Sequence, residues 1–201
     1  MNGVSIREAK GFIFDMDGTL VSVSVDWTAV RAKLAELSGR PDFVPLFETL
    51  MQVLQTNPEL RPRIFKMLDE FELQGEPEAR LIDGSREALE LLSRRAKIAL
   101  VTMQGTKVRD GILQRFGLTG FFHVLLSRED SLDRAEQLTM ATARLGLQKD
   151  EVVFVGDRLH DLNSAARIGM SFVLMGDRPG ATAENFSDMK AFLGFLRNQG
   201  R

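Results

Sequence analysis

The chain has no cysteine among its 201 residues and only two histidines, His123 and His160. The absence of cysteine excludes disulfides, thiolate metal sites and a cysteine nucleophile. Two histidines are too few for a metal site built from several imidazoles. A large excess of charge of one sign is also missing, because the chain has 26 basic and 28 acidic residues and a formal net charge of −2. Proteins that bind nucleic acid present a basic patch, so we expect no nucleic-acid partner.

Long apolar runs are absent as well. A membrane-spanning helix needs about 20 apolar residues, whereas the apolar runs here are strand-sized pieces such as residues 98–101. The N-terminal segment carries Arg7, Glu8 and Lys10 where a signal peptide needs its apolar region. We therefore expect a cytoplasmic protein without a membrane partner. The oligomeric state is left open.

What the chain does contain is an alternation of strand-like and helix-like segments. Short apolar, β-rich runs occupy residues 12–15, 98–102, 121–126, 152–155 and 172–175. They are continuously apolar, which is typical of strands buried on both faces of a parallel sheet. Between them, helical spacing covers residues 85–95, 106–116 and 137–145. The alternation predicts an α/β fold with right-handed βαβ units in a doubly wound parallel sheet.

One region breaks this alternation. Residues 26–80 contain no convincing strand but three helical patterns, at 27–37, 43–54 and 60–73, with Pro41 and Pro58 between them. Prolines stop helices, and a segment of this length is too long for a loop. We predict a core formed by residues 1–20 and 81–201, and a small helical subdomain formed by residues 21–80 over the end of the sheet.

Acidic side chains follow the first predicted strand directly. Asp15 and Asp17 come at its end and are followed by Gly18. Ligands collect beyond the carboxyl ends of the strands in open α/β sheets. Two carboxylates this close repel each other unless a cation or a shared proton relieves them. The structural alternative is an aspartate–glycine turn. An EF-hand loop is excluded, because its glycine falls at the sixth position and here it falls at the fourth.

Two further strands end in polar residues. Thr102 ends the strand at 98–102 just before a helix, where a hydroxyl and free backbone N–H groups can hold an anion. Thr102 could instead cap that helix. Asp157 and Asp161 follow the strand at 152–155. Three strand ends that deliver acid or hydroxyl groups to one edge predict a functional site.

The segments DMDGT, VT before a helix, and VGDRLHD resemble the first, second and fourth motifs of the haloacid dehalogenase superfamily. The helical segment after the first motif looks like the C1 cap of that superfamily. The resemblance covers essentially the whole chain and is strongest to members of the phosphoglycolate phosphatase and β-phosphoglucomutase type. It implies a Rossmann-like core with the first-motif strand in the middle of the sheet.

The resemblance also implies residue roles. Asp15 matches the nucleophile that attacks phosphorus and carries an aspartyl-phosphate. Asp17 matches the general acid and base. Mg²⁺ would be held by Asp15, the backbone carbonyl of Asp17 and Asp157, with Asp161 bonded to the ion or one layer behind it. An aspartate two residues after the nucleophile argues against dehalogenation, because the dehalogenases of the family lack it.

The phosphate would be bound by other groups. The resemblance assigns this role to the Thr102 hydroxyl, with the backbone N–H groups of Met103 and of the turn at Gly18 beside it. Phosphoryl transfer needs mainly positioning and neutralisation of charge on the phosphate oxygens. These groups supply donors for that purpose.

The third motif of the superfamily, a lysine that compensates charge on the nucleophile and phosphate, is missing. An ungapped alignment places Leu132 at that position. Arg134 is the best substitute and Arg128 the second, although Arg134 could also lie on a solvated helix face. Without a cation at the site, the negative charge would be under-compensated and turnover slow.

We therefore expect a Mg²⁺-dependent phosphomonoester hydrolase that acts on a small phosphorylated metabolite. Two alternatives stay open: a sugar phosphomutase of the β-phosphoglucomutase type, and a non-catalytic phosphate-binding or regulatory protein. His160 is expected at the rim of its loop. The aromatic residues Trp27, Phe43 and Phe47 are expected to pack without a role in the site, and Arg31 is expected on a solvated face.

Overall fold

The computed structural model describes residues 4–176 and 184–198. The strands are β1 (Gly11–Phe14), β2 (Val21–Ser22), β3 (Arg80–Leu81), β4 (Lys97–Val101), β5 (Val124–Leu126), β6 (Val152–Gly156), β7 (Ser171–Met175) and β8 (Glu184–Phe186). The α-helices are α1 (Trp27–Ser38), α2 (Leu46–Thr56), α3 (Arg61–Gly75), α4 (Ser85–Ser93), α5 (Thr106–Arg115), α6 (Arg134–Leu145), α7 (Leu159–Ile168) and α8 (Met189–Asn198). Short 3₁₀ turns lie at Pro58–Leu60, Glu76–Glu78, Thr119–Phe121 and Lys149–Glu151.

Six strands form one parallel sheet in the order β5-β4-β1-β6-β7-β8. The first-motif strand β1 lies inside the sheet, between β4 and β6, and is buried along its whole length. Phe14 is in register with Leu100 of β4 and with Val155 of β6. The residues that follow these three strands therefore reach the same edge of the sheet. The predicted α/β, Rossmann-like fold is confirmed.

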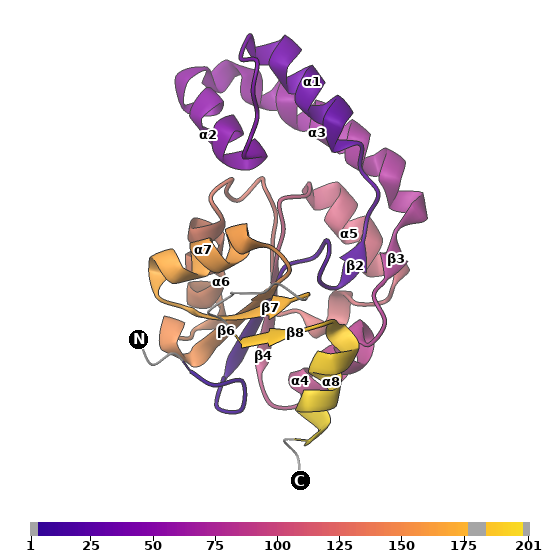
Figure 1. Ribbon diagram of the computed structural model, residues 1–201, viewed down its shortest axis with the longest axis vertical. Coiled ribbons are helices and arrows are strands. Elements are labelled where there is room, and N and C mark those ends of the chain that lie inside the picture. The colour runs from indigo at the N-terminus through magenta and orange to yellow at the C-terminus, as the bar shows by residue number, and fades with distance from the viewer. Residues whose placement is uncertain (1–3, 177–183, 199–201) are drawn as a thin grey trace.

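Helices cover both faces of the sheet. The pair α6 and α7 lies on one face, and α4, α5 and α8 lie on the other (Figure 1). Within β1 the side chains alternate between these layers, because Ile13 belongs to the apolar cluster with α6 and α7, and Phe12 and Phe14 belong to the cluster on the opposite face. Burial on both faces explains why the strand sequences are apolar without alternation.

The helices α1, α2 and α3 lie beyond the carboxyl edge of the sheet, and α3 also contacts α5 of the core (Figure 1). They share a third apolar cluster, to which Leu34, Leu50 and Leu68 contribute fully buried side chains. The antiparallel ribbon of β2 and β3 lies where the chain leaves the core and returns to it. We call residues 21–80 the helical insert. Its boundaries, and those of the core at 1–20 and 81–201, stay predictions, and residues 1–3, 177–183 and 199–201 of that core lie outside the described residues.

Several elements differ from the sequence expectations. Helix α2 begins at Leu46 instead of residue 43, because a proline disfavours the helical conformation of the residue before it, and Pro45 follows Val44. The two-residue strands β2 and β3 fall at the ends of the region expected to be helical. After residue 175, where the sequence pattern predicts no element, the chain forms β8 and α8. Among the described residues, no helix is both long and apolar enough to cross a membrane.

Candidate active site

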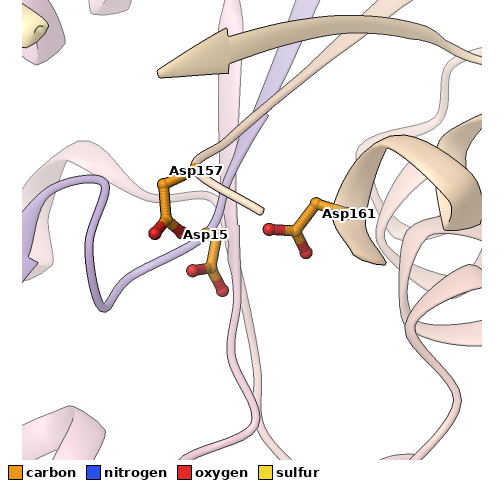
Figure 2. A group of neighbouring side chains, drawn as sticks. All are labelled: Asp15, Asp157 and Asp161. Carbon is orange, nitrogen blue, oxygen red and sulfur yellow. The ribbon is translucent and has the colours of Figure 1, made fainter. Parts of the chain in front are cut away.

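Three carboxylates converge beyond the carboxyl edge of the sheet. Asp15 follows β1, Asp157 follows β6, and Asp161 lies in the first turn of α7. One carboxylate oxygen from each lies within 4.8 Å of the other two, and Figure 2 shows Asp161 directed at the space beside Asp15 and Asp157. The expectation that separate strand ends meet at one edge is therefore realised for these three residues.

Asp17 lies beside this group without joining it. Its Oδ1 accepts a hydrogen bond of 2.9 Å from the backbone N–H of Val23. The next residue, Gly18, has a φ of 85°, and a Cβ there would lie 2.4 Å from Oδ2 of Asp157. Only glycine allows this turn to pass so close to the carboxylate. The role expected of Asp17 in metal binding involves its backbone carbonyl and stays a prediction.

Several oxygens of this cluster of three carboxylates have no hydrogen-bond partner among the described residues. Oδ1 of Asp157 and both carboxylate oxygens of Asp161 are buried and accept no hydrogen bond from the residues that the structure describes. Buried acceptors without partners are costly, and neighbouring carboxylates repel each other. Mg²⁺ prefers oxygen ligands, carboxylates among them. The orphaned oxygens of Asp157 and Asp161, with Asp15 beside them, therefore fit a divalent cation.

Burial raises the pKa values of the acids in and beside this cluster. Burial raises the pKa of Asp15 to about 7; the Arg134 guanidinium opposes this rise, and the Asp161 carboxylate adds to it. Burial, followed by the charge of Asp15, raises the pKa of Asp157 to about 6. Burial also raises the pKa of Asp161 and of Asp17. A cation at this place would return these groups to their charged forms.

Arg134 supplies one positive charge to the group. Its Nη2 donates a hydrogen bond of 2.7 Å to Oδ1 of Asp15, and its Nε lies 3.2 Å from Oδ1 of Asp161. The side chain is buried, so the alternative of a solvated helix face is excluded. Arg134 is the first residue of α6, and the Asp133 carboxylate caps that helix. The structure places Arg134 where the missing lysine would be needed, while its catalytic role stays a prediction.

Arg128, the second substitute, lies elsewhere. Its guanidinium forms ion pairs with Asp69 and Glu72 of α3. Leu132, at the position of the missing lysine, packs in the apolar cluster of the helical insert. The ion pairs of Arg128 and the apolar contacts of Leu132 therefore join the core to the helical insert, and neither residue pairs with Asp15.

Thr102 follows β4 and is buried beside Asp15. Its Oγ1 accepts a hydrogen bond of 3.1 Å from the backbone N–H of Gln104. The residue at the N-cap of α5 is Gly105, so Thr102 does not cap that helix. Its hydroxyl proton is therefore available to a phosphate oxygen, and Met103 lines the same cavity.

A cavity of about 260 Å³ opens above Asp15, between the core and the helical insert. The insert lines it with Trp27, Phe47 and Glu48, and with Arg31, which donates to the backbone carbonyls of Trp27 and Phe43. The rings of Trp27 and Phe47 lie edge to face at 6.2 Å. Phe43, which was expected to pack together with Trp27 and Phe47, is buried and does not line the cavity. The absence of a site role for these three aromatic residues stays a prediction.

His160 also joins the two sides of the cavity. Its Nδ1 lies 2.6 Å from Oε1 of Glu48, which links α7 to α2. His160 is expected at the rim of its loop, and its partner Glu48 is not among the expected site residues. The contact between these two residues has no local signal in the sequence, because it depends on how the helical insert lies over the core.

Comparison with known proteins agrees with this geometry. The model of the haloacid dehalogenase-like hydrolase family matches residues 12–175, from β1 to β7. The chain belongs to this family. The family assignment made from the motifs is therefore confirmed, and so is the expectation of a hydrolase of this type.

Curated relatives within the haloacid dehalogenase-like family include two phosphatases. The N-acetylmuramic acid 6-phosphate phosphatase of Pseudomonas aeruginosa is 27% identical in an alignment of 178 positions that covers 80% of this chain and 78% of that protein. The phosphoglycolate phosphatase of Synechococcus elongatus is 25% identical in an alignment of 171 positions that covers 80% of this chain and 81% of that protein.

Solved structures show the same fold. The crystal structure of a HAD-superfamily hydrolase of subfamily IA from Geobacter sulfurreducens superposes with a TM-score of 0.66 at 24% identity, and covers 93% of this chain and 99% of that one. A HAD phosphatase from Thermococcus onnurineus superposes with a TM-score of 0.63 at 20% identity, over 93% of this chain and 97% of that one.

Proposed function

We propose that this phosphatase of the haloacid dehalogenase type is a Mg²⁺-dependent phosphomonoester hydrolase that acts on a small phosphorylated metabolite. The observation that carries the proposal is the convergence of the Asp15, Asp157 and Asp161 carboxylates with Arg134 below one cavity. The two curated phosphatases are named for N-acetylmuramic acid 6-phosphate and phosphoglycolate, which supports a small phosphate ester as the substrate.

Asp15 is the nucleophile. One of its carboxylate oxygens bonds to phosphorus while the bond from phosphorus to the leaving alcohol oxygen breaks, which leaves an aspartyl-phosphate. Arg134 holds Oδ1 of Asp15 at 2.7 Å and offsets its charge as the phosphate approaches. The Thr102 hydroxyl donates to a phosphate oxygen. Water then attacks phosphorus, and inorganic phosphate leaves the restored carboxylate.

Asp17 moves the protons. Burial raises the pKa of its carboxyl, so a larger share is protonated near neutral pH than for a solvated aspartate. The protonated form donates to the oxygen of the leaving alcohol. The resulting carboxylate then accepts a proton from the attacking water. The Val23 N–H bonded to Oδ1 fixes the orientation of the Asp17 side chain during both transfers.

A divalent ion fits the orphaned oxygens of Asp157 and Asp161. Together with Asp15 and the backbone carbonyl of Asp17, these residues would hold Mg²⁺. When bound, the ion supplies positive charge that offsets the carboxylates and the phosphate. The close approach of Gly18 to Asp157 keeps the turn carrying Asp17 beside the three carboxylates.

The helical insert at residues 21–80 acts as a cap in this proposal. Trp27 and Phe47 place apolar surface over the reaction centre, and the contact between His160 and Glu48 holds α2 against α7. A closed cap excludes water other than the one that attacks the aspartyl-phosphate. A cytoplasmic location, where small phosphorylated metabolites occur, belongs to the same proposal.

Phosphate release from a panel of phosphomonoesters, including p-nitrophenyl phosphate, tests the proposal. Wild type, Asp15→Asn and the control Asp83→Asn are each assayed with magnesium and with a chelator. Asp83 is a suitable control because its side chain is 76% exposed and pairs only with Lys190 among the ion pairs of the described residues. We expect release that requires both magnesium and Asp15, with Asp83→Asn equal to wild type.

Three results would contradict the hydrolase. Folded protein that releases no phosphate from any ester would leave a phosphate-binding protein. Isomerisation of a sugar phosphate that is stimulated by the bisphosphate would indicate a phosphomutase. Release that persists in Asp15→Asn would place the reaction on a different residue.

A further inference from the structure

Gln104 has an unusual environment for a buried polar side chain. It lines the cavity two residues after Thr102 and is 3% exposed. Its Oε1 and Nε2 are both buried and find no hydrogen-bond partner among the residues that the structure describes. A buried amide without partners is unfavourable, and native structures rarely keep one without a reason.

Another buried glutamine nearby shows the contrast. Gln137 donates from Nε2 to the backbone carbonyls of Thr102, Ser127 and Ser131, and its Oε1 accepts from Arg134. Its amide is saturated by protein groups and holds the strand ends together. Gln104 has none of these bonds, so a purely structural role does not explain it.

The backbone around Gln104 is held on both sides. Nη1 of Arg128 donates to the carbonyl of Met103 at 3.2 Å, and Oε2 of Glu72 accepts from the N–H of Gly105 at 3.0 Å. The N–H of Gln104 itself donates to Oγ1 of Thr102. Arg128 and Glu72 are buried and paired with each other. The loop therefore cannot carry the Gln104 side chain out to solvent without breaking its hydrogen bonds to a buried ion pair.

We propose that Gln104 is a substrate-binding residue that recognises a neutral hydrogen-bonding group, a hydroxyl or a carboxamide, on the leaving alcohol close to the phosphate ester. An amide offers donors and an acceptor without charge, which matches such a group better than a carboxylate or an ammonium. The closeness to Thr102, which donates to the phosphate, sets the short separation from the ester. This inference rests on the proposed hydrolase function.

A substrate without such a group would leave the amide unpaired in the occupied cavity. Sites built to hydrogen-bond a substrate group discriminate strongly against analogues that lack it. The wild-type enzyme should therefore prefer a hydroxylated ester over its deoxygenated counterpart. The preference, expressed as a ratio of kcat/KM values, isolates this contact from steps common to both esters.

The experiment compares glycerol 3-phosphate with propyl phosphate, which lacks both hydroxyls. Carbamoylmethyl phosphate and phosphoglycolate form a second pair, which differs by a carboxamide and a carboxylate. Wild type and Gln104→Leu are assayed with magnesium, and Gln55→Leu serves as the matched control because Gln55 is exposed on α2 and does not line the cavity. Thermal melting of each variant checks folding.

We expect wild type to favour at least one neutral polar ester over its partner, and Gln104→Leu to reduce that ratio by about tenfold or more, mainly through KM. Gln55→Leu should keep the wild-type ratio. The melting temperature of Gln104→Leu should not fall, because an apolar side chain removes two unpaired polar atoms.

The inference is overturned if Gln104→Leu lowers kcat/KM equally for both members of each pair, or if wild type shows no preference within either pair. A preference for phosphoglycolate that is lost in Gln104→Leu would also overturn it, because the recognised group would then be charged. Hydrolysis in any of these cases leaves the proposed function standing. If no ester is hydrolysed by folded protein, the proposed function fails, and this inference fails with it.

Discussion

Two buried arginines lie on either side of Leu132, and the buried acids beside them differ in how many hydrogen bonds they accept. Arg128 pairs with Asp69, Glu72 and, at 3.8 Å, Glu129, whereas Arg134 pairs with Asp15 and Asp161. Around Arg128, Glu72 accepts from Nη1 of the arginine at 2.5 Å and from the N–H of Gly105 at 3.0 Å. Around Arg134, both oxygens of Asp161 are buried and accept no hydrogen bond from the described residues.

The difference separates a structural ion pair from a functional one. At Arg128 the buried charges of Arg128 and Glu72 are matched, and the pair joins α3 to the loop after β5, which contains Arg128. Both side chains also hydrogen-bond to the backbone of the loop after β4. At Arg134 one guanidinium serves Asp15 and Asp161 while Asp157 lies close by, so negative charge is left over. Uncompensated buried charge is costly for folding and is typical of sites that bind a cation or perform chemistry.

The largest expected effect is the loss of activity when Asp15, which accepts a hydrogen bond from Arg134, is replaced. Asp15→Asn should lower phosphate release by about 10⁴-fold or more, because the nucleophile is lost. Without magnesium its melting temperature should not fall, since the substitution removes a charge that burial disfavours. Enzyme assays and thermal melting measure the two effects. A steep fall in melting temperature would assign Asp15 a structural role like that of Glu72.

The next effect concerns the matched pair. Arg128→Met should lower the free energy of unfolding by about 3–5 kcal/mol, because Glu72 is left buried without its cation. Urea denaturation measures this loss, with the exposed Arg94→Gln as control. Changing Glu72 to Leu in the same chain should recover much of the stability. Unchanged stability together with lost activity would break the distinction between the two arginines.

Arg134→Gln should act mainly on rate. We expect kcat/KM to fall by about 10²–10³-fold, the usual cost of removing one group that stabilises charge in the transition state. Arg134→Lys should fall less, because it keeps the positive charge. Steady-state kinetics with p-nitrophenyl phosphate provides the measurement. Equal activity in wild type and Arg134→Gln would show that another group replaces the missing lysine.

The smallest effect is a change in stability with pH. Burial raises the pKa of Asp15 to about 7 and of Asp157 to about 6, so the metal-free folded protein holds protons that the unfolded chain has released. Its stability should therefore fall as pH rises from about 4 to about 7. Magnesium binds the charged forms, so its stabilising effect should be greater at about pH 8 than at about pH 5.5.

Thermal melting with and without magnesium at both pH values checks this prediction. Asp157→Asn should lose most of the magnesium effect at the higher pH. An equal shift at the two pH values, or one retained in Asp157→Asn, would place the ion away from the three carboxylates.

The sequence was most informative where function depends on strand ends. Asp15, Thr102 and Asp157 each follow an apolar run, and parallel strands bring such positions to one edge. Arg134 was found because the family pattern requires a cation near its position. These inferences use short-range sequence patterns or a known motif, and neither kind of inference requires knowledge of tertiary packing.

The cavity wall could not be predicted in the same way. Trp27 and Phe47 have the helical spacing of packing residues, and nothing local shows that their helices lie over Asp15. The contact between His160 and Glu48 depends on the placement of the helical insert. Gln104 looks like an ordinary loop residue until its buried amide is seen to lack partners.

The most direct test of the account is to trap the phosphoryl group on Asp15. Asp17→Asn is mixed with p-nitrophenyl phosphate and magnesium and then quenched in acid. Nitrophenolate leaves without a proton, so the first step proceeds, while loss of the base slows hydrolysis. We expect a phosphoryl group on the peptide that contains Asp15, removable by hydroxylamine and absent from Asp15→Asn. A burst of nitrophenol with no phosphoryl group on Asp15, or with one on another residue, would contradict the account.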